Sequence, residues 1–255
     1  LQHRAQAGLG VGQRDRDRQL PERRQRIALV GPRVLLALQQ AVRRQGAHRA
    51  RILVRAAQLL QGAVSLQRID AFGKTREDLA QPGDAVLISG TLGDHGIAVL
   101  SARGELGLET QITSDVAPMN TLVSALTDKI KNIHVLRDPT RGGLATTLNE
   151  IAVQSYVSIT IEEPNIPINK SVGAACELLG FDPLYVANEG KVIVILPEQF
   201  ANQALSIMKS HQYGQNAARI GTVNAEPKAL VLLKTRIGSN RVLDVMAGEM
   251  LPRIC

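Results

Sequence analysis

An abrupt change in amino-acid usage near residues 68–74 limits where this chain can encode a stable fold. Residues 1–70 contain 14 Arg but no Lys, Asn, Thr, Phe, Tyr, Trp, Met or Cys, whereas all of these except Trp occur in residues 71–255. The first segment has only four acidic residues and a net charge of +10, and the second has a net charge of −3. The basic character of the chain therefore belongs to its N-terminal segment, and we expect the folded domain in residues 71–255.

The Arg-, Gln-, Ala- and Leu-rich segment 1–70 is open to three interpretations. Clustered arginines suit a nucleic-acid-binding arm, because they neutralise phosphates. Residues 34–60 have the pattern of an amphipathic basic helix that lies on a membrane or on a partner. The missing residue types favour non-native sequence, such as a shifted reading frame, and a disordered segment is compatible with each interpretation. The coding DNA, read in all frames, distinguishes them.

Residues 71–255 have the pattern of alternating strands and helices. Short apolar runs bounded by Gly, Pro or Asn are typical of buried strands, and apolar residues three to four apart are typical of helices. Thr140 is the predicted N-cap of one helix, and Gly180 is the predicted end of another. A layered α+β or α/β fold follows. Strands are predicted at 85–89, 132–136, 157–161, 191–196, 218–223, 229–233 and 241–245, and helices at 97–102, 117–131, 141–154, 171–179 and 199–210.

Residues 89–96, Ser-Gly-Thr-Leu-Gly-Asp-His-Gly, form a glycine-rich loop between a predicted strand and a predicted helix. Backbone N–H groups at a helix start suit anions, and glycine lets a ligand approach the backbone closely. Asp94 and His95 add a titratable pair that can move protons. A tight strand-to-helix turn without a ligand explains the same glycines.

A second motif, Arg-Asp-Pro-Thr-Arg-Gly-Gly at 137–143, places two arginines at a predicted helix start. Arginine suits bidentate contact with phosphate or carboxylate. The alternative is a loop pinned by an Arg–Asp pair. The motif lacks the Lys-Ser/Thr of a P-loop, so a Walker-type site is not predicted.

A third motif, Ala-Asn-Glu-Gly-Lys at 187–191, places Glu189 just before a predicted strand. A carboxylate beside a glycine in this position can be a general base, a metal ligand or a hydrogen-bond acceptor. The alternative is a loop carboxylate in a salt bridge with a lysine.

The sequence has two cysteines, Cys176 and Cys255. This number argues against a disulfide framework and favours a reducing, cytoplasmic location, and the spacing of cysteines and histidines predicts no metal site. We expect Cys176 in the core of a helix-packed layer. Cys255 is the last residue, and a mobile thiol can carry a covalently bound group between sites. A chance surface cysteine or a truncation is the alternative. Neither a signal peptide nor a long apolar run is found.

These motifs together, in this order, resemble the C-terminal domain and cysteine tail of HypE, a family of hydrogenase maturation proteins related to aminoimidazole ribonucleotide (AIR) synthase. The resemblance covers about residues 72–255, and it rests on residues 82–96, 137–143, 173–191 and 252–255, the last being Pro-Arg-Ile-Cys. It implies an AIR synthase C-terminal-like domain of layered α+β structure over 71–255, with a functional tail at 246–255.

The resemblance also implies a chemistry, the synthesis of the cyanide ligands of [NiFe]-hydrogenase. Cys255 would receive a carbamoyl group from HypF, and ATP with Mg²⁺ would drive its dehydration from a thiocarbamate to a thiocyanate. Cyanide would then pass to the HypC–HypD complex. Glu189 and His95 are the implied proton acceptors. The implied ATP-facing or tail-docking residues are Asp94, Arg137, Asp138 and Arg141.

One part of the family pattern is not found in residues 1–70. The family's N-terminal domain carries most of the ATP and Mg²⁺ ligands and the surface of the homodimer. We therefore expect this chain to lack the ATP-dependent step while still presenting Cys255 for carbamoylation. The alternatives are a basic nucleic-acid-binding protein that acts through residues 1–70, and another ATP-dependent enzyme of the same superfamily. Normal function after Cys255→Ala would indicate the last of these.

Overall fold

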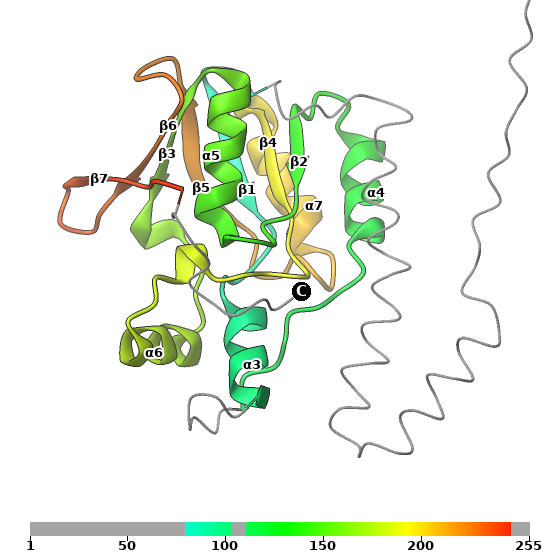
Figure 1. Cartoon of the computed structure of the whole chain (residues 1–255). Coiled ribbons are helices and arrows are strands. Elements are labelled where there is room, and N and C mark those ends of the chain that lie inside the picture. The colour runs from blue at the N-terminus through cyan, green and yellow to red at the C-terminus, as the bar shows by residue number, and fades with distance from the viewer. Residues whose placement is uncertain (1–79, 104–110, 246–255) are drawn as a thin grey trace, which may run out of the picture.

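The computed structural model describes residues 80–103 and 111–245. The predictions for residues 1–70 and for the cysteine tail at 246–255 lie outside these ranges. Within the described ranges, no helix is both long and apolar enough to cross a membrane. Figure 1 shows the described residues as a twisted sheet with helices on its two faces and at one end.

One sheet of seven strands forms the centre of the domain, in the order β2-β4-β1-β5-β3-β6-β7. Neighbouring strands are antiparallel except for β3 and β6, which are parallel. Every predicted strand is present, with ends shifted by three residues at most, so the predicted layered α+β fold is confirmed. The strands are β1 (Asp84–Ile88), β2 (Val135–Arg137), β3 (Ser158–Glu162), β4 (Ile193–Pro197), β5 (Ala218–Asn224), β6 (Leu230–Lys234) and β7 (Asn240–Val242).

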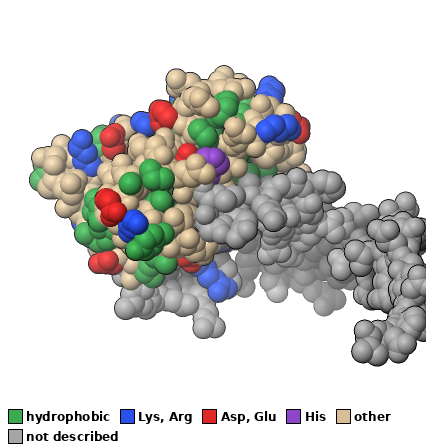
Figure 2. Space-filling model, turned by 90° about the horizontal axis from the view of Figure 1, so that it is seen from above, with side chains coloured by type: hydrophobic (Ala, Val, Ile, Leu, Met, Phe, Trp, Pro, Cys, Tyr) green, Lys and Arg blue, Asp and Glu red, His purple; other side chains and the backbone are tan. Residues whose placement is uncertain are grey.

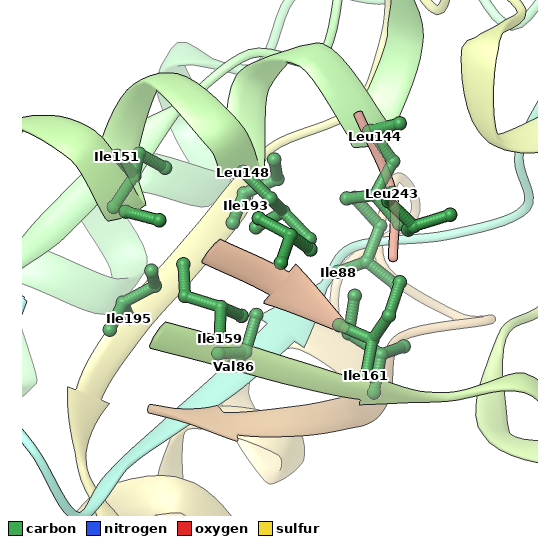
Figure 3. Close-up of a cluster of buried hydrophobic side chains, with 14 of the residues drawn as sticks. Val86, Ile88, Leu144, Leu148, Ile151, Ile159, Ile161, Ile193, Ile195 and Leu243 are labelled. Atoms are coloured by element: carbon green, nitrogen blue, oxygen red, sulfur yellow. The ribbon is translucent and has the colours of Figure 1, made fainter. Parts of the chain in front are cut away.

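Different helices cover the two faces of the sheet, because side chains alternate along each strand. On β1, Val86 and Ile88 belong to the core under α5 (Gly143–Ser155). Ala85 and Leu87 instead belong to the core under α4 (Asn120–Lys129) and α7 (Ala201–Lys209). All residues of β1 are buried, as expected for a central strand covered on both sides. Figure 3 shows the core on the α5 side.

The predicted start of the first described helix is wrong. α3 (Asp94–Arg103) begins three residues before the predicted start at Ile97. Asp94 and His95 therefore lie in the first helical turn, where we expected a loop. The glycine-rich segment is shorter than the sequence pattern indicated, and it turns at Gly93, which has a φ of +82°.

The predicted N-cap of α5 is also wrong. The cap is Gly142, with a φ of +68° and no side-chain hydrogen bond, and the helix begins at Gly143. A Cβ atom on Gly143 would lie 2.6 Å from the carbonyl oxygen of Leu184, which belongs to the short helix η4 (Pro183–Tyr185). Thr140 is therefore not the N-cap. The close approach of the Gly143 backbone to η4, and not a capping hydroxyl, determines where this helix starts.

The predictions for α6 (Lys170–Leu179) and for its cysteine are confirmed. The helix ends at Gly180, which adopts the left-handed conformation with a φ of +69°. Cys176 is fully buried in a small cluster between α6 and α3. Burial, with a further contribution from Asp182, raises the pKa of the Cys176 thiol to about 11. Cys176 is therefore a core residue that is protonated at neutral pH.

The last described residues are attached to the domain at three positions, Arg241, Leu243 and Asp244. Arg241 forms an ion pair with Asp182 at 2.6 Å. The Asn149 amide donates to the Leu243 carbonyl at 2.7 Å, and the Tyr185 hydroxyl donates to the Asp244 carbonyl at 2.9 Å. The chain therefore leaves the described domain from a fixed point beside α5 and η4.

The surface of the described residues carries charges of both signs. Figure 2 shows acidic and basic side chains interspersed on one face, together with several hydrophobic side chains. This mixture agrees with the small net charge of residues 71–255. The visible face has no broad basic patch of the kind that binds a nucleic-acid backbone.

Candidate active site

The glycine-rich segment is bonded to the protein through several of its backbone N–H groups. The N–H of Leu92 donates to Pro167 O at 3.0 Å, and the N–H of Gly96 donates to Ala187 O at 3.2 Å. The N–H of Gly93 donates to the Asn188 side chain at 2.8 Å. These three donors already have acceptors, which favours the interpretation of a tight turn over that of an anion site at these positions.

Asp94 lies at the N-terminus of α3, where a negative charge is favourable. Its carboxylate accepts from the Thr91 hydroxyl at 2.5 Å and from the Asn169 amide at 2.6 Å. The side chain is buried and joins the start of α3 to the residue before α6. These contacts account for Asp94 as a structural residue, and its role toward a cofactor stays a prediction.

His95 is a buried titratable group whose pKa departs from its ordinary value. Its Nδ1 atom is 2.9 Å from the hydroxyl oxygen of Ser114. Burial lowers the pKa of His95, and the nearby negative charges of Glu189 and Asp115 partly oppose this effect. His95 is therefore neutral at pH 7, which is the form that can accept a proton.

Glu189 lies between two residues that fix the backbone on either side. Asn188 is buried, and its side chain donates to the carbonyls of Pro139 and Val186 at 3.1 and 3.0 Å. On the other side, a Cβ atom on Gly190 would lie only 1.8 Å from the carbonyl oxygen of Asp115. Glu189 is partly buried, so its carboxylate is attached to a rigid backbone at the edge of the site.

Lys191 forms an ion pair with a carboxylate that lies outside the third motif. The Lys191 ammonium is ion-paired with Asp115 at 2.8 Å. The second Asp115 oxygen accepts from the backbone N–H of Glu189 at 3.2 Å. Asp115 is therefore the residue that connects Lys191 with Glu189.

The arginine motif lies next to this region and contacts it through its backbone. The carbonyl of Pro139 accepts from both the backbone and the side chain of Asn188. Arg137 is ion-paired with Glu150 of α5 at 2.5 Å. Asp138 is partly buried and Arg141 is exposed. The predicted roles of Arg137, Asp138 and Arg141 toward ATP or the tail stay predictions, and Cys255 lies outside the described residues.

Sequence reasoning missed Ser114 and Asp115, which complete the site. They lie in residues 111–119, which contain no helix or strand. Asp115 is 74 positions before Glu189, and no local pattern marks it. One signal was present for its partner, because Lys191 directly follows the Glu-Gly pair at the start of a buried strand.

We expect the domain to lose stability below pH 6.5 because of His95. Its pKa is lower in the folded protein than the ordinary value of 6.5, so the unfolded chain binds a proton first as the pH falls. This contribution to the free energy of unfolding is complete above pH 6.5 and is lost as the pH falls toward the lowered pKa. Urea unfolding at about pH 7.5 and about pH 5.5 measures the loss. His95→Gln should reduce it, and an equal loss in both proteins would contradict the assignment.

Comparison with known proteins places this geometry in a family. The family model described as "AIR synthase related protein, C-terminal domain" matches residues 81–234. This range includes all seven strands except β7, together with His95, Asp115 and Glu189. The chain therefore belongs to the family of AIR synthase-related C-terminal domains.

Within this family the chain is similar to HypE proteins. The carbamoyl dehydratase HypE of Cupriavidus necator is 51% identical over 176 residues, which are 69% of this chain and 50% of the relative. HypE of Escherichia coli is 42% identical over 173 residues, or 68% of this chain and 51% of the relative. The chain thus spans about half the length of the curated relatives that it matches. The resemblance inferred from the motifs is confirmed.

Solved structures give the same result. A crystal structure of HypE in complex with ATP is 48% identical, with a TM-score of 0.67, and the match covers 71% of this chain and 55% of that chain. HypE in a crystal structure of the HypE–HypF complex is 51% identical, with a TM-score of 0.64, and the match covers 67% of this chain and 55% of that chain.

Proposed function

We propose that this domain is the C-terminal part of a carbamoyl dehydratase that acts in the maturation of [NiFe]-hydrogenase. The observation that carries the proposal is the 51% identity with a carbamoyl dehydratase over 176 residues. The neighbouring side chains of His95, Asp115 and Glu189 support it, because dehydration of an amide requires bases near the nitrogen.

In the proposed reaction, Cys255 carries the substrate. Its thiolate accepts a carbamoyl group, which gives a thiocarbamate, R–S–C(=O)–NH₂. Loss of one water molecule converts this group to a thiocyanate, R–S–C≡N, so the carbon–oxygen bond breaks and two protons leave the nitrogen. Glu189 accepts a proton from the nitrogen, and neutral His95 is the second acceptor. A sulfur atom on the last residue can present the group to several proteins in turn.

ATP and Mg²⁺ are the co-substrate and ion that the resemblance implies. Within residues 80–103 and 111–245, no group of three or more His, Cys, Asp or Glu could hold a metal ion. The backbone donors of the glycine-rich segment described above are also bonded to the protein. The ligands of ATP and Mg²⁺ therefore stay a prediction; when bound, ATP would activate the carbamoyl oxygen as a leaving group, and the proton transfers above are the part assigned to the chain's own residues.

The proposed partners follow from the relatives. HypF is the proposed carbamoyl donor, since a HypE–HypF complex is among the similar structures. The HypC–HypD complex is the proposed cyanide acceptor, and homodimer formation and a cytoplasmic location belong to the same proposal.

Carbamoylation of the chain tests the proposal directly. We expect incubation of the full chain with HypF, carbamoyl phosphate and ATP to add one carbamoyl group to the peptide that contains Cys255, as measured by mass spectrometry. Cys255→Ser should remove the adduct completely. Cys176→Ser should retain it, because Cys176 is buried and its thiol has a pKa of about 11. An unmodified tail, or an adduct on Cys176, would reject the proposal.

A further inference from the structure

Asp115 connects two segments that are far apart in the sequence and meet at the candidate site. One carboxylate oxygen accepts from the backbone N–H of Glu189 at 3.2 Å, and the other accepts from the Lys191 ammonium at 2.8 Å. The residues that it holds lie on either side of Gly190. A single side chain therefore fixes the backbone directly before β4.

The Asp115–Lys191 ion pair is buried, which gives it a defined geometry. The side chains are 4% and 9% exposed, respectively. A buried charge is maintained only when it is paired and its remaining hydrogen-bonding capacity is satisfied. Lys191 satisfies one oxygen of Asp115 and the Glu189 backbone satisfies the other, so the lysine fixes Asp115 and Asp115 fixes Glu189.

Two glycines show that this arrangement is closely packed. A Cβ atom on Gly190 would lie 1.8 Å from the Asp115 carbonyl oxygen, so the two backbones are in direct contact. A Cβ atom on Gly90 would lie 3.0 Å from Cε of Lys191, so the lysine stem passes close to the end of β1. The backbone around Asp115 has little room to move.

The same backbone is bonded to the helix that carries His95. Gly93 and Gly96, on either side of His95, donate to Asn188 and Ala187, respectively. Ser114, next to Asp115, is hydrogen-bonded to the ring of His95. Each of three segments is therefore hydrogen-bonded to the other two: the segment with Glu189, the segment with Asp115 and the start of α3.

We propose that Asp115 is a positioning residue for Glu189, and that it holds the Glu189 backbone so that the Glu189 carboxylate stays beside His95. The inference rests on the proposed function, in which Glu189 accepts a proton from the carbamoyl nitrogen. A displacement of about 1 Å in such a group costs about 100-fold in rate.

Titration of His95 by NMR tests this coupling in the full chain without any enzymatic assay. The pKa of His95 is measured in the wild type, Glu189→Gln, Asp115→Asn and the double variant, with the His95 signal assigned from His95→Gln. Glu189→Gln should lower the pKa of His95, because it removes a negative charge. In the Asp115→Asn background the same change should produce at most about half of that shift, because Glu189 is no longer held near the ring.

Equal shifts in the two backgrounds would overturn the proposal, since independent charges act additively. If Asp115→Asn does not fold, the background becomes Asp115→Asn/Lys191→Met, which leaves no unpaired ammonium in the interior. Glu198→Gln is the matched control, because Glu198 pairs with Arg219 at the opposite end of β4, and the pKa of His95 should stay unchanged. The titration uses no carbamoyl donor, so a failure of Cys255 carbamoylation would reject the proposed function without affecting this result.

Discussion

Gly190→Ala is expected to destabilise the domain by more than about 3 kcal/mol, a loss that is exceptional for the addition of one methyl group. The new Cβ atom would lie 1.8 Å from the Asp115 carbonyl oxygen and 2.8 Å from the Ala117 nitrogen. Both obstacles are backbone atoms, so a change of side-chain rotamer cannot relieve the clash. The two segments must separate, which also breaks the hydrogen bond from Glu189 to Asp115. Urea unfolding monitored by circular dichroism measures the effect.

Gly173→Ala is the matched control for this prediction. Gly173 lies inside α6. The heavy atom nearest to a Cβ added there would be a side-chain carbon of Ile168 at 3.8 Å, which is an ordinary contact. Alanine is preferred over glycine inside a helix by about 0.5–1 kcal/mol, so this variant should be more stable than the wild type. Similar stabilities for the two alanine variants would contradict the close backbone contact at Gly190.

Leu148→Ala is expected to reduce the free energy of unfolding by about 2–5 kcal/mol. Leu148 is fully buried in the core between α5 and the sheet. Figure 3 shows it beside Ile193 of β4, with Leu144 and Ile151 on the same helix. The substitution loses the free energy of transferring three carbon atoms from water into the core. It also leaves a cavity that the close-packed neighbours fill only in part.

The control for the core prediction is Leu178→Ala. Leu178 is 72% exposed on α6, so the same change of residue type should alter the stability by less than about 0.5 kcal/mol. Both variants are compared with the wild type in the same urea titration. A loss below about 1 kcal/mol for Leu148→Ala would show that α5 does not pack on the sheet as described.

Local patterns in the sequence were sufficient to predict the strands. β1 and β4 are short, mainly aliphatic runs between turn residues, and a chain with this pattern gains most by burying both faces of the strand. The end of α6 was predictable because Gly180 can adopt a positive φ at little cost. These features depend on residues that are neighbours in the sequence.

The helix starts and most of the site depend instead on contacts between distant residues. α5 begins at Gly143 because the carbonyl of Leu184, 41 positions later, lies where a Cβ atom would be. His95 and Glu189 were predictable as titratable residues in glycine-containing motifs. Asp115 was not, because its importance comes from two bonds to residues 74 and 76 positions away.

The attachment of residues 241–244 to the domain sets a geometric limit on the chemistry of Cys255. Eleven residues follow Asp244, up to and including Cys255. A fully extended chain covers about 3.6 Å per residue, so the sulfur atom stays within a sphere of about 40 Å around the Tyr185–Asp244 hydrogen bond. Asn149 and Tyr185 thus hold the fixed end of this segment, and under the proposed function each enzyme that modifies Cys255 must bring its reaction centre inside that radius.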